Sequence, residues 1–384
     1  MEAQRVVVIQ DASREVSSSA LRWALQGLSL MPGDMLTLLS VLRQVETHSE
    51  TPHARSKKLC VTEESHVQKM TQSSRTEKAE WQAKEIFQNP MCALCKNRRP
   101  NFSWQRDFTY AELYDATDGF SSQNSLSEGG IGSAFRCQLK SNNMKIVVKQ
   151  HRNSSPQGEM DFLSEVDLLM KARHKNVLML LGSCIEGRMK LLVYEYACNG
   201  SVYHHISKHC PLPLTWVERM KVALGAARGL NYLHENNIVY RNMRTCNIVL
   251  THEFEPRLAD FGFSWEHNVL ENLGYLAPEY PGNRKLSTET DVYAFGVVLL
   301  ELISGRMVKD KIPGGKVLWD GPLLKERRLL EIVDPRISDS HDAEQLYWMG
   351  RVTQNCLSKV PKKRLTMDKV VSALECITER NLGI

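Results

Sequence analysis

The sequence has no N-terminal signal segment with a long apolar core, and its longest clearly apolar run, residues 295–303, is too short to span a bilayer. We therefore expect no membrane span and interpret that run as a buried helix. Ten cysteines are scattered without a regular framework, which argues against a disulfide-rich secreted fold and favours a reducing, cytoplasmic compartment. The formal net charge of +5 is modest and the basic residues are dispersed, so nucleic-acid binding is not expected.

The composition is typical of a soluble globular protein, with 42% hydrophobic and 24% charged residues. At 384 residues the chain is longer than one ordinary domain. The pattern predicts a small unit over residues 1–45, a linker over 46–107 and a large domain over 108–384, whose core covers about 120–380. No internal repeat or low-complexity tract interrupts the large domain.

The first segment has the pattern of a βαβ unit. An apolar run at residues 5–9 ends near Asp11, a helical pattern covers 21–28, and a second β-like run follows at 35–42. This segment resembles the opening of the universal stress protein family, an adenine-nucleotide-binding α/β fold in which Asp11 matches the acidic residue after the first strand. Because no later strand carries that family's Gly-rich phosphate loop, we expect a structural or docking remnant rather than an independent nucleotide site.

The linker is polar and basic over residues 46–62, and a polar helix is expected over 63–87. Cys92 and Cys95 then form a single CxxC motif. A structural zinc site usually takes four ligands, and no further pair follows at comparable spacing. The sequence therefore favours two reduced loop thiols over a metal site.

Residues 126–134, LSEGGIGSA, lie between β-like runs and include Gly129 and Gly132. Glycine is needed where backbone amides approach phosphates closely, although a single Gly-rich loop is a weak signal. Lys149 ends the next strand, and Glu165 lies on a predicted helix whose apolar residues recur at three- and four-residue spacing. Such a lysine and glutamate could pair, but each could also be an ordinary surface residue.

Residues 191–196, LLVYEY, predict a strand that ends with Glu195 and Tyr196. The segment YRNMRTCN follows at 240–247, and Asp260 lies 13 residues beyond Asn247 in LADFG. Amide and carboxylate oxygens are ligands that Mg²⁺ accepts.

The order and spacing of these motifs resemble those of protein kinases over about residues 120–380. Residues 276–280 (LAPEY) and 291–305 (DVYAFGVVLLELISG) extend the resemblance, and Arg364 is placed to pair with Glu279. The sequence of these motifs is similar to that of plant receptor-like cytoplasmic kinases of the receptor-like/Pelle group. Together with the stress-protein-like start and the CxxC motif, it is similar to a plant subgroup that includes members described as inactive kinases.

The resemblance implies an α+β two-lobed protein kinase fold preceded by a small α/β unit, with ATP and Mg²⁺ as cofactors. The residues that it implies for binding nucleotide are Gly129, Gly132, Lys149, Glu165, Glu195 and Tyr196. Those that it implies for metal are Asn247 and Asp260, and those in the catalytic loop are Arg241, Asn242 and Arg244.

The chain departs from the kinase pattern where phosphoryl transfer needs a base. Asn242 stands in place of the catalytic-loop aspartate, and an amide cannot accept the proton of a substrate hydroxyl. A general base typically contributes about 10²- to 10⁴-fold in rate. Asn272 also replaces a threonine, and Ser264 is the only Ser or Thr hydroxyl in residues 262–277, so switching by phosphorylation of this segment is not expected.

Further replacements surround the expected nucleotide site. Tyr240 takes the place of a histidine, Ser127 that of the first loop glycine and Ala134 that of the valine that covers adenine. Three functions remain open. They are a nucleotide-binding pseudokinase that acts on a receptor kinase or signalling protein as a scaffold or allosteric partner, a weakly active Ser/Thr kinase, and an interaction module that binds no nucleotide. We expect a cytoplasmic protein, with peripheral attachment to the plasma membrane left open.

Overall fold

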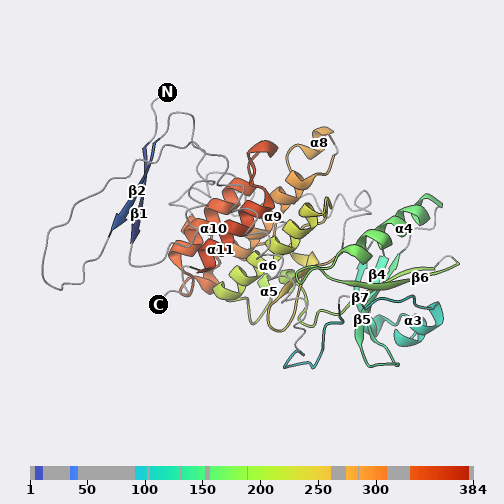
Figure 1. The fold of residues 1–384 in the computed structure, drawn as a ribbon. Coiled ribbons are helices and arrows are strands. Elements are labelled where there is room, and N and C mark those ends of the chain that lie inside the picture. The colour runs from blue at the N-terminus through green and yellow to red at the C-terminus, as the bar shows by residue number, and fades with distance from the viewer. Residues whose placement is uncertain are drawn as a thin grey trace, which may run out of the picture. The chain divides into compact units, whose positions relative to one another are not determined.

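The computed structural model describes residues 5–11, 35–41, 91–101, 104–129, 132–151, 156–187, 189–260, 274–283, 285–308 and 329–379 (Figure 1). The chain divides into two compact units, Met1–Lys84 and Glu85–Ile384. The helical pattern at 21–28, the polar linker at 46–62 and the polar helix expected at 63–87 lie outside the described residues.

In the first unit two strands pair in parallel, β1 (Arg5–Asp11) and β2 (Met35–Val41), in a register from Arg5 opposite Met35 to Asp11 opposite Val41. Both predicted strands are confirmed. The helix expected between them lies outside the described residues, so the complete βαβ unit stays a prediction.

The second unit contains an antiparallel sheet of five strands in the order β3-β4-β5-β7-β6. The strands are β3 (Ser125–Gly129), β4 (Gly132–Gln138), β5 (Lys145–His151), β6 (Leu180–Glu186) and β7 (Met189–Glu195). The segment before the sheet already belongs to this unit, since the backbone N–H groups of Arg106 and Phe108 donate to the carbonyls of Leu181 and Ser183 at 3.1 Å. The unit therefore extends further toward the N-terminus than residue 108, where the sequence pattern changes.

Alternation along β5 separates the core from the functional face. Ile146 and Val148 are fully buried in one apolar cluster with residues that include Leu113 of α3 (Tyr110–Ala116). Val147 and Lys149 point to the opposite face, because successive side chains on a strand alternate. One face of the strand thus packs the lobe while the other lines a cavity.

Most of the remaining described elements of the second unit are helices, and Figure 1 shows α6, α9, α10 and α11 side by side. The helices are α4 (Pro156–Lys171), which packs on β6, then α5 (Val202–Ile206), α6 (Trp216–Glu235), α8 (Tyr280–Asn283), α9 (Thr288–Ser304), α10 (Ala343–Cys356) and α11 (Met367–Glu379). A short hairpin of β8 (Ile248–Leu250) and β9 (Pro256–Leu258) lies between α6 and α8 in the chain. The prediction of a sheet-rich lobe followed by a mostly helical lobe is confirmed.

Helix α9 contains the apolar run at 295–303 and is buried on all sides, as predicted. Its first turn is capped by Thr290, whose hydroxyl accepts from the backbone N–H of Ser287 at 2.9 Å. It ends at Gly305, where φ is +62° and a Cβ would lie 2.1 Å from Asp334 Oδ2. Among the described residues, no helix combines the length and the apolar composition that crossing a membrane requires.

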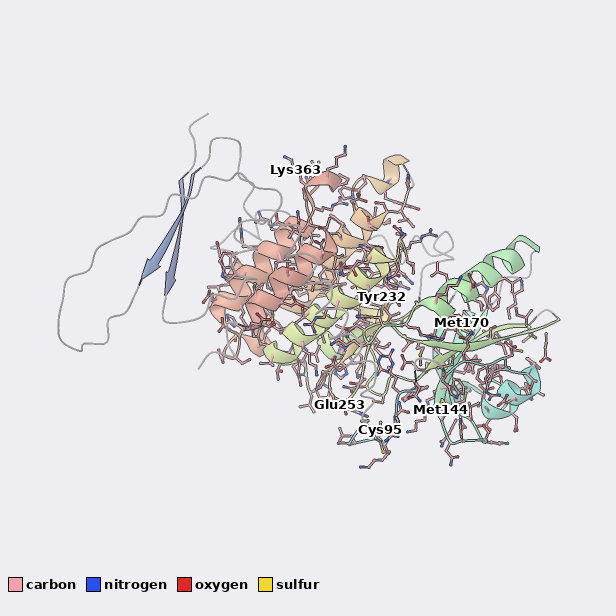
Figure 2. The ribbon with its side chains drawn as sticks, viewed as in Figure 1. Cys95, Met144, Met170, Tyr232, Glu253 and Lys363 are labelled. Atoms are coloured by element: carbon pink, nitrogen blue, oxygen red, sulfur yellow. The ribbon has the colours of Figure 1, made fainter. Side chains whose placement is uncertain are left out.

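The junction after α4 holds a histidine in its neutral form. The ring of His174 stacks on Tyr232 of α6 (labelled in Figure 2) with centroids 4.9 Å apart, and its Nδ1 accepts from the backbone N–H of Asn176 at 3.1 Å. Burial, together with the positive charges of Lys175, Arg99 and Arg228, lowers the pKa of His174 to about 3. Folding therefore opposes protonation of this ring.

We expect this histidine to weaken the fold in mild acid. The unfolded chain protonates near pH 6.5 and the folded chain only near pH 3, so the stability is complete above pH 6.5 and falls as the pH drops toward 3. The loss at pH 5 should be on the order of 2 kcal/mol. Urea unfolding at pH 7 and pH 5 should show a smaller loss in His174→Gln than in the unaltered chain. Equal losses in the two proteins would contradict the assignment, and exposed His209→Gln serves as the matched control.

Candidate functional site

A cavity of about 530 Å³ opens between the helical part of the second unit and the face of the sheet that carries Val147 and Lys149. Residues from β3, β4 and β5 form one wall, and the segment after β7 and the residues around β8 and β9 form the other. Among the residues that line it are Ser127, Gly132, Ala134, Lys149, Glu195, Tyr196, Arg244, Asn247 and Asp260.

The hairpin of β3 and β4 requires glycine where it faces its neighbour strand. A Cβ on Gly132 would lie 1.9 Å from the carbonyl oxygen of Gln150, so a side chain here would push the two strands apart. Gly129 pairs with Gly132 in the strand register, and Ser127 pairs with Ala134. The predicted Gly-rich loop is therefore a hairpin against the cavity, although residues 130 and 131 lie outside the described part.

Lys149 is oriented into the cavity by the alternation of β5 and forms an ion pair with Asp260. The two side chains are 17% and 32% exposed. The sequence predicted Glu165 as the partner of Lys149. Glu165 lies on α4 as expected, but its side chain is outside the described part of the chain, so this pairing stays a prediction.

At the end of β7, the side chain of Glu195 is 1% exposed and forms two ion pairs inside the protein. Arg99 Nη2 lies 2.7 Å and Arg257 Nη1 2.8 Å from its carboxylate, which also accepts from the backbone N–H of Met179 at 2.8 Å. Burial alone would raise the pKa of Glu195, but the positive charges of Arg257 and Arg99 lower it. Glu195 is thus a structural hub as well as part of the cavity wall.

Sequence reasoning missed Arg99. Besides Glu195, its guanidinium donates to the main-chain carbonyls of His174, Lys175 and Val177 at 2.8 to 3.1 Å. The neighbouring Arg98 is exposed. Nothing in the run of basic residues after Cys95 distinguishes the buried arginine from the exposed one, because only the three-dimensional packing selects between them.

The loop at 240–247 is held by Asp291 of α9. The Asp291 carboxylate accepts from the backbone N–H groups of Tyr240 and Arg241, each at 2.7 Å, and lies 3.0 Å from His234 Nε2. This clamp holds Arg241 at a φ of +67°, a conformation that L-residues rarely adopt. The buried Tyr240 hydroxyl donates to the carbonyl of Ala259, and burial raises its pKa well above the ordinary value.

Asn242 is 5% exposed, and the nitrogen and the oxygen of its side-chain amide have different environments. Its Nδ2 donates to the main-chain carbonyl of Asp260 at 2.7 Å. Its Oδ1 is buried and has no hydrogen-bond partner among the described residues. The main-chain carbonyl of Asn242 accepts from Asn247 Nδ2 at 2.9 Å, which ties the two asparagines together. The loop therefore carries at this position a buried neutral amide and no negative charge.

Asn247, Asp260 and Arg244 all line the cavity. Asp260 has a φ of +53°, and the backbone N–H of the preceding Ala259 donates to the Asn247 carbonyl at 2.8 Å. An amide oxygen and a carboxylate on one wall form a donor set that suits Mg²⁺, and the cationic groups of Lys149 and Arg244 suit phosphates. The residues present thus fit a magnesium nucleotide.

The predicted pair of Arg364 and Glu279 is confirmed. The guanidinium donates to both carboxylate oxygens at 2.6 Å, and it also binds the carbonyls of Glu289 and Ser358. This bidentate pair anchors the segment before α8. Asn272 and Ser264 lie outside the described residues, so the structure does not place the expected change opposite Asn242.

Comparison with known proteins gives a family match and several relatives. Residues 120–374 match the family described as "Protein tyrosine and serine/threonine kinase". The chain is 39% identical to "Probable serine/threonine-protein kinase PBL23" of Arabidopsis thaliana over 289 residues, which cover 70% of this chain and 75% of that protein. It is 33% identical to "Probable serine/threonine-protein kinase PBL3" of the same plant over 366 residues, 88% of this chain and 85% of the relative.

A third relative, "Proline-rich receptor-like protein kinase PERK3" of Arabidopsis thaliana, is 35% identical over 315 residues, which cover 73% of this chain. The match spans 61% of that longer protein.

Because Arg99 pairs with the buried Glu195, we expect the same substitution to change the stability far more at Arg99 than at the adjacent Arg98. Arg99→Met should destabilise the second unit by on the order of 3 kcal/mol, because it leaves the Glu195 carboxylate buried with one cation fewer. Arg98→Met changes the same residue type in an exposed position and should be within about 0.5 kcal/mol of the unaltered chain. The midpoints of urea unfolding measure both stability changes, provided that the dependence of the unfolding free energy on urea concentration is the same in all variants. Equal midpoints for the two variants would show that Arg99 contributes little.

Proposed function

Because the chain belongs to the protein tyrosine and serine/threonine kinase family, we propose that it is a pseudokinase of the plant receptor-like cytoplasmic kinase type. In this proposal it binds MgATP, transfers phosphoryl groups poorly or not at all, and acts in the cytoplasm as a scaffold or allosteric partner of a receptor kinase or signalling protein.

One observation carries the proposal: Asn242 stands in the clamped loop with its amide nitrogen bound to the Asp260 carbonyl and its oxygen buried. That oxygen is buried and Asn242 does not line the cavity, and an amide oxygen could in any case only accept a hydrogen bond from a substrate hydroxyl. A neutral amide cannot take the hydroxyl proton, so the step that normally needs a carboxylate has no base at this position.

Retention of the surrounding groups supports nucleotide binding. Lys149 and Arg244 would hold phosphates, and Asn247 and Asp260 would hold Mg²⁺. Bound MgATP supplies the phosphoryl group and neutralises charge between the phosphates. In this proposal the chain's own residues bind and orient it, with Gly132 in the hairpin that lines the cavity.

Nucleotide binding should appear as thermal stabilisation. At 100 times its dissociation constant, MgATP should add about 2.7 kcal/mol to the stability of the unaltered chain. Lys149→Met should remove most of this gain, since it deletes the phosphate-facing cation. Lys145→Met, on the same strand but not among the residues lining the cavity, is the matched control and should keep the gain. If MgATP stabilises none of the three proteins, the chain binds no nucleotide.

Phosphoryl transfer should be limited by the missing base. The rate of phosphoryl transfer by the unaltered chain should not exceed that of Asp260→Ala. Asn242→Asp should raise the rate, by up to the about 10²- to 10⁴-fold that a general base contributes. The new carboxylate cannot donate the hydrogen bond that Asn242 gives to the Asp260 carbonyl. The double variant Asn242→Asp with Asn272→Thr, which restores the kinase pattern at both positions, should therefore be measured beside the single variant. Asn242→Leu, which has neither acceptor nor charge, should give no gain. Transfer of a radiolabelled γ-phosphate to a general substrate protein measures all of these variants.

A weakly active Ser/Thr kinase is the second candidate, and the presence of Lys149, Asn247 and Asp260 on one cavity wall favours it. Phosphoryl transfer by the unaltered chain above the Asp260→Ala background, abolished by Lys149→Met, would establish this candidate and refute the pseudokinase. The third candidate, an interaction module without nucleotide, draws on Ser127 and Ala134, which face each other across the hairpin and line the cavity.

The N-terminal segment is a separate part of the proposal. We propose that residues 1–45 are a truncated unit of the universal stress protein type that serves docking and does not bind nucleotide. The parallel pairing of β1 and β2, with Asp11 at the end of β1, supports this likeness.

A further inference from the structure

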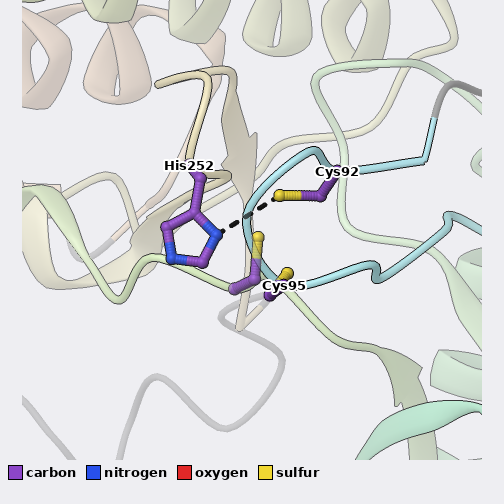
Figure 3. Close-up of side chains that lie close together, drawn as sticks. Cys92, Cys95 and His252 are labelled. Carbon is purple, nitrogen blue, oxygen red and sulfur yellow. Dashed lines mark hydrogen bonds between the residues drawn. The ribbon is translucent and has the colours of Figure 1, made fainter.

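Three cysteines and one histidine from separate segments converge on the side of the second unit that carries the segment before the sheet. Cys92 and Cys95 come from that segment, Cys198 follows β7, and His252 lies in the turn between β8 and β9. The three sulfurs and one histidine nitrogen all lie within 4.8 Å of one another. Figure 3 shows His252 facing Cys92 and Cys95, with Cys92 Sγ 3.4 Å from His252 Nδ1.

This convergence changes the interpretation of the CxxC motif. The sequence favoured two reduced loop thiols because no second pair of ligands follows at comparable spacing. The structure supplies that second pair from far along the chain, since 160 residues separate Cys92 from His252. Spacing along the sequence therefore does not exclude two further ligands for this motif.

The distances suit a tetrahedral zinc ion. With Zn–S bonds of about 2.3 Å and Zn–N bonds of about 2.0 to 2.1 Å, tetrahedral ligands lie about 3.8 Å apart for two sulfurs and about 3.6 Å apart for sulfur and nitrogen. The observed 3.4 Å between Cys92 Sγ and His252 Nδ1, and the upper limit of 4.8 Å for the whole group, need only small movements to reach these values.

The CxxC segment is already folded as a tight turn that presents both thiols. Met91 and Arg98 form a β-bridge, the N–H of Cys92 donates to the Asn97 carbonyl at 2.8 Å, and the N–H of Lys96 donates to the Cys92 carbonyl at 3.0 Å. Lys96 closes the turn with a φ of +55°. The turn needs no metal-induced rearrangement to bring Cys92 and Cys95 together.

The other two ligands are also positioned by contacts independent of a metal. Asn199, next to Cys198, donates its backbone N–H to the Leu250 carbonyl at 2.9 Å and its side chain to the Thr251 carbonyl at 3.1 Å. The side chain of Asn97 donates to the Tyr196 carbonyl at 3.0 Å. Hydrogen bonds therefore fix the three ligand-bearing segments against one another.

We propose that Cys92, Cys95, Cys198 and His252 bind one Zn²⁺ in a closed structural site. Three thiolates and one neutral imidazole fill the tetrahedron, so no position remains open for water or substrate. Binding releases the thiol protons to solvent and involves no change of oxidation state. The ion joins the segment before the sheet both to the strand end at the cavity and to the β8–β9 turn.

Two other states of these thiols are possible, and the test separates them. None of the nine described cysteines forms a disulfide, so the four residues could be a reduced cluster without metal, or Cys92 and Cys95 could oxidise to a disulfide. A disulfide would remove two ligands and exclude the zinc site.

Metal analysis of the full chain, purified without added metal or chelator, tests the proposal. We expect one zinc per chain by inductively coupled plasma mass spectrometry and its release when a mercurial reagent titrates the thiols. Cys95→Ser and Cys198→Ser should lose the zinc. Cys210→Ser, in a loop away from the cluster, should retain it, and His252→Cys should also retain it by offering a fourth thiolate.

Cobalt gives a readout that does not depend on the variants folding. Chain from which zinc has been removed and replaced by Co²⁺ should show the intense ligand-field bands of a tetrahedral site and thiolate charge transfer. The proposal fails if the unaltered chain holds well under one zinc, if both serine variants keep their zinc, or if alkylation without reduction reveals a Cys92–Cys95 disulfide. None of these results bears on nucleotide binding or phosphoryl transfer.

Discussion

The clamp of Asp291 on the loop at 240–247 is the constraint on which the candidate site depends. One carboxylate, in the first turn of a helix that is buried from Thr290 onward, accepts two backbone N–H groups and keeps Arg241 in a left-handed conformation. Without that clamp the loop would relax, and Asn242 and Asn247 would no longer face Asp260. The proposed loss of a base at Asn242 would therefore be a chemical change within a loop whose backbone is held from outside it.

Glu195 forms a second centre, and it explains why the segment before the sheet belongs to the second unit. A fully buried carboxylate is costly unless it is paired, and here Arg99 and Arg257 supply the charge from opposite directions along the chain. The same strand end continues into Tyr196 and Cys198, so the arginine pair and the proposed zinc site would hold the same part of the cavity wall.

Much of the site could be predicted from the sequence because its residues occur in motifs with fixed order. Short local motifs indicate Lys149, Asn247 and Asp260 as candidate site residues, and all three line the cavity in the structure. The pairing of Glu279 with Arg364 followed from the same reasoning. The apolar run at 295–303 predicts the buried helix α9, because a helix that is apolar on every side is stable only in the core of a protein.

What the sequence could not predict depends on contacts between distant segments. Cys198 lies in a strand exit and His252 in a hairpin turn, and neither has neighbours that suggest a ligand. Arg99 is indistinguishable from Arg98 until Glu195 is placed. These contacts have a consequence for the order of biosynthesis. The ribosome makes Arg99 long before Glu195, so the segment that carries Arg99 cannot complete its buried contacts until β7, which ends at Glu195, has emerged.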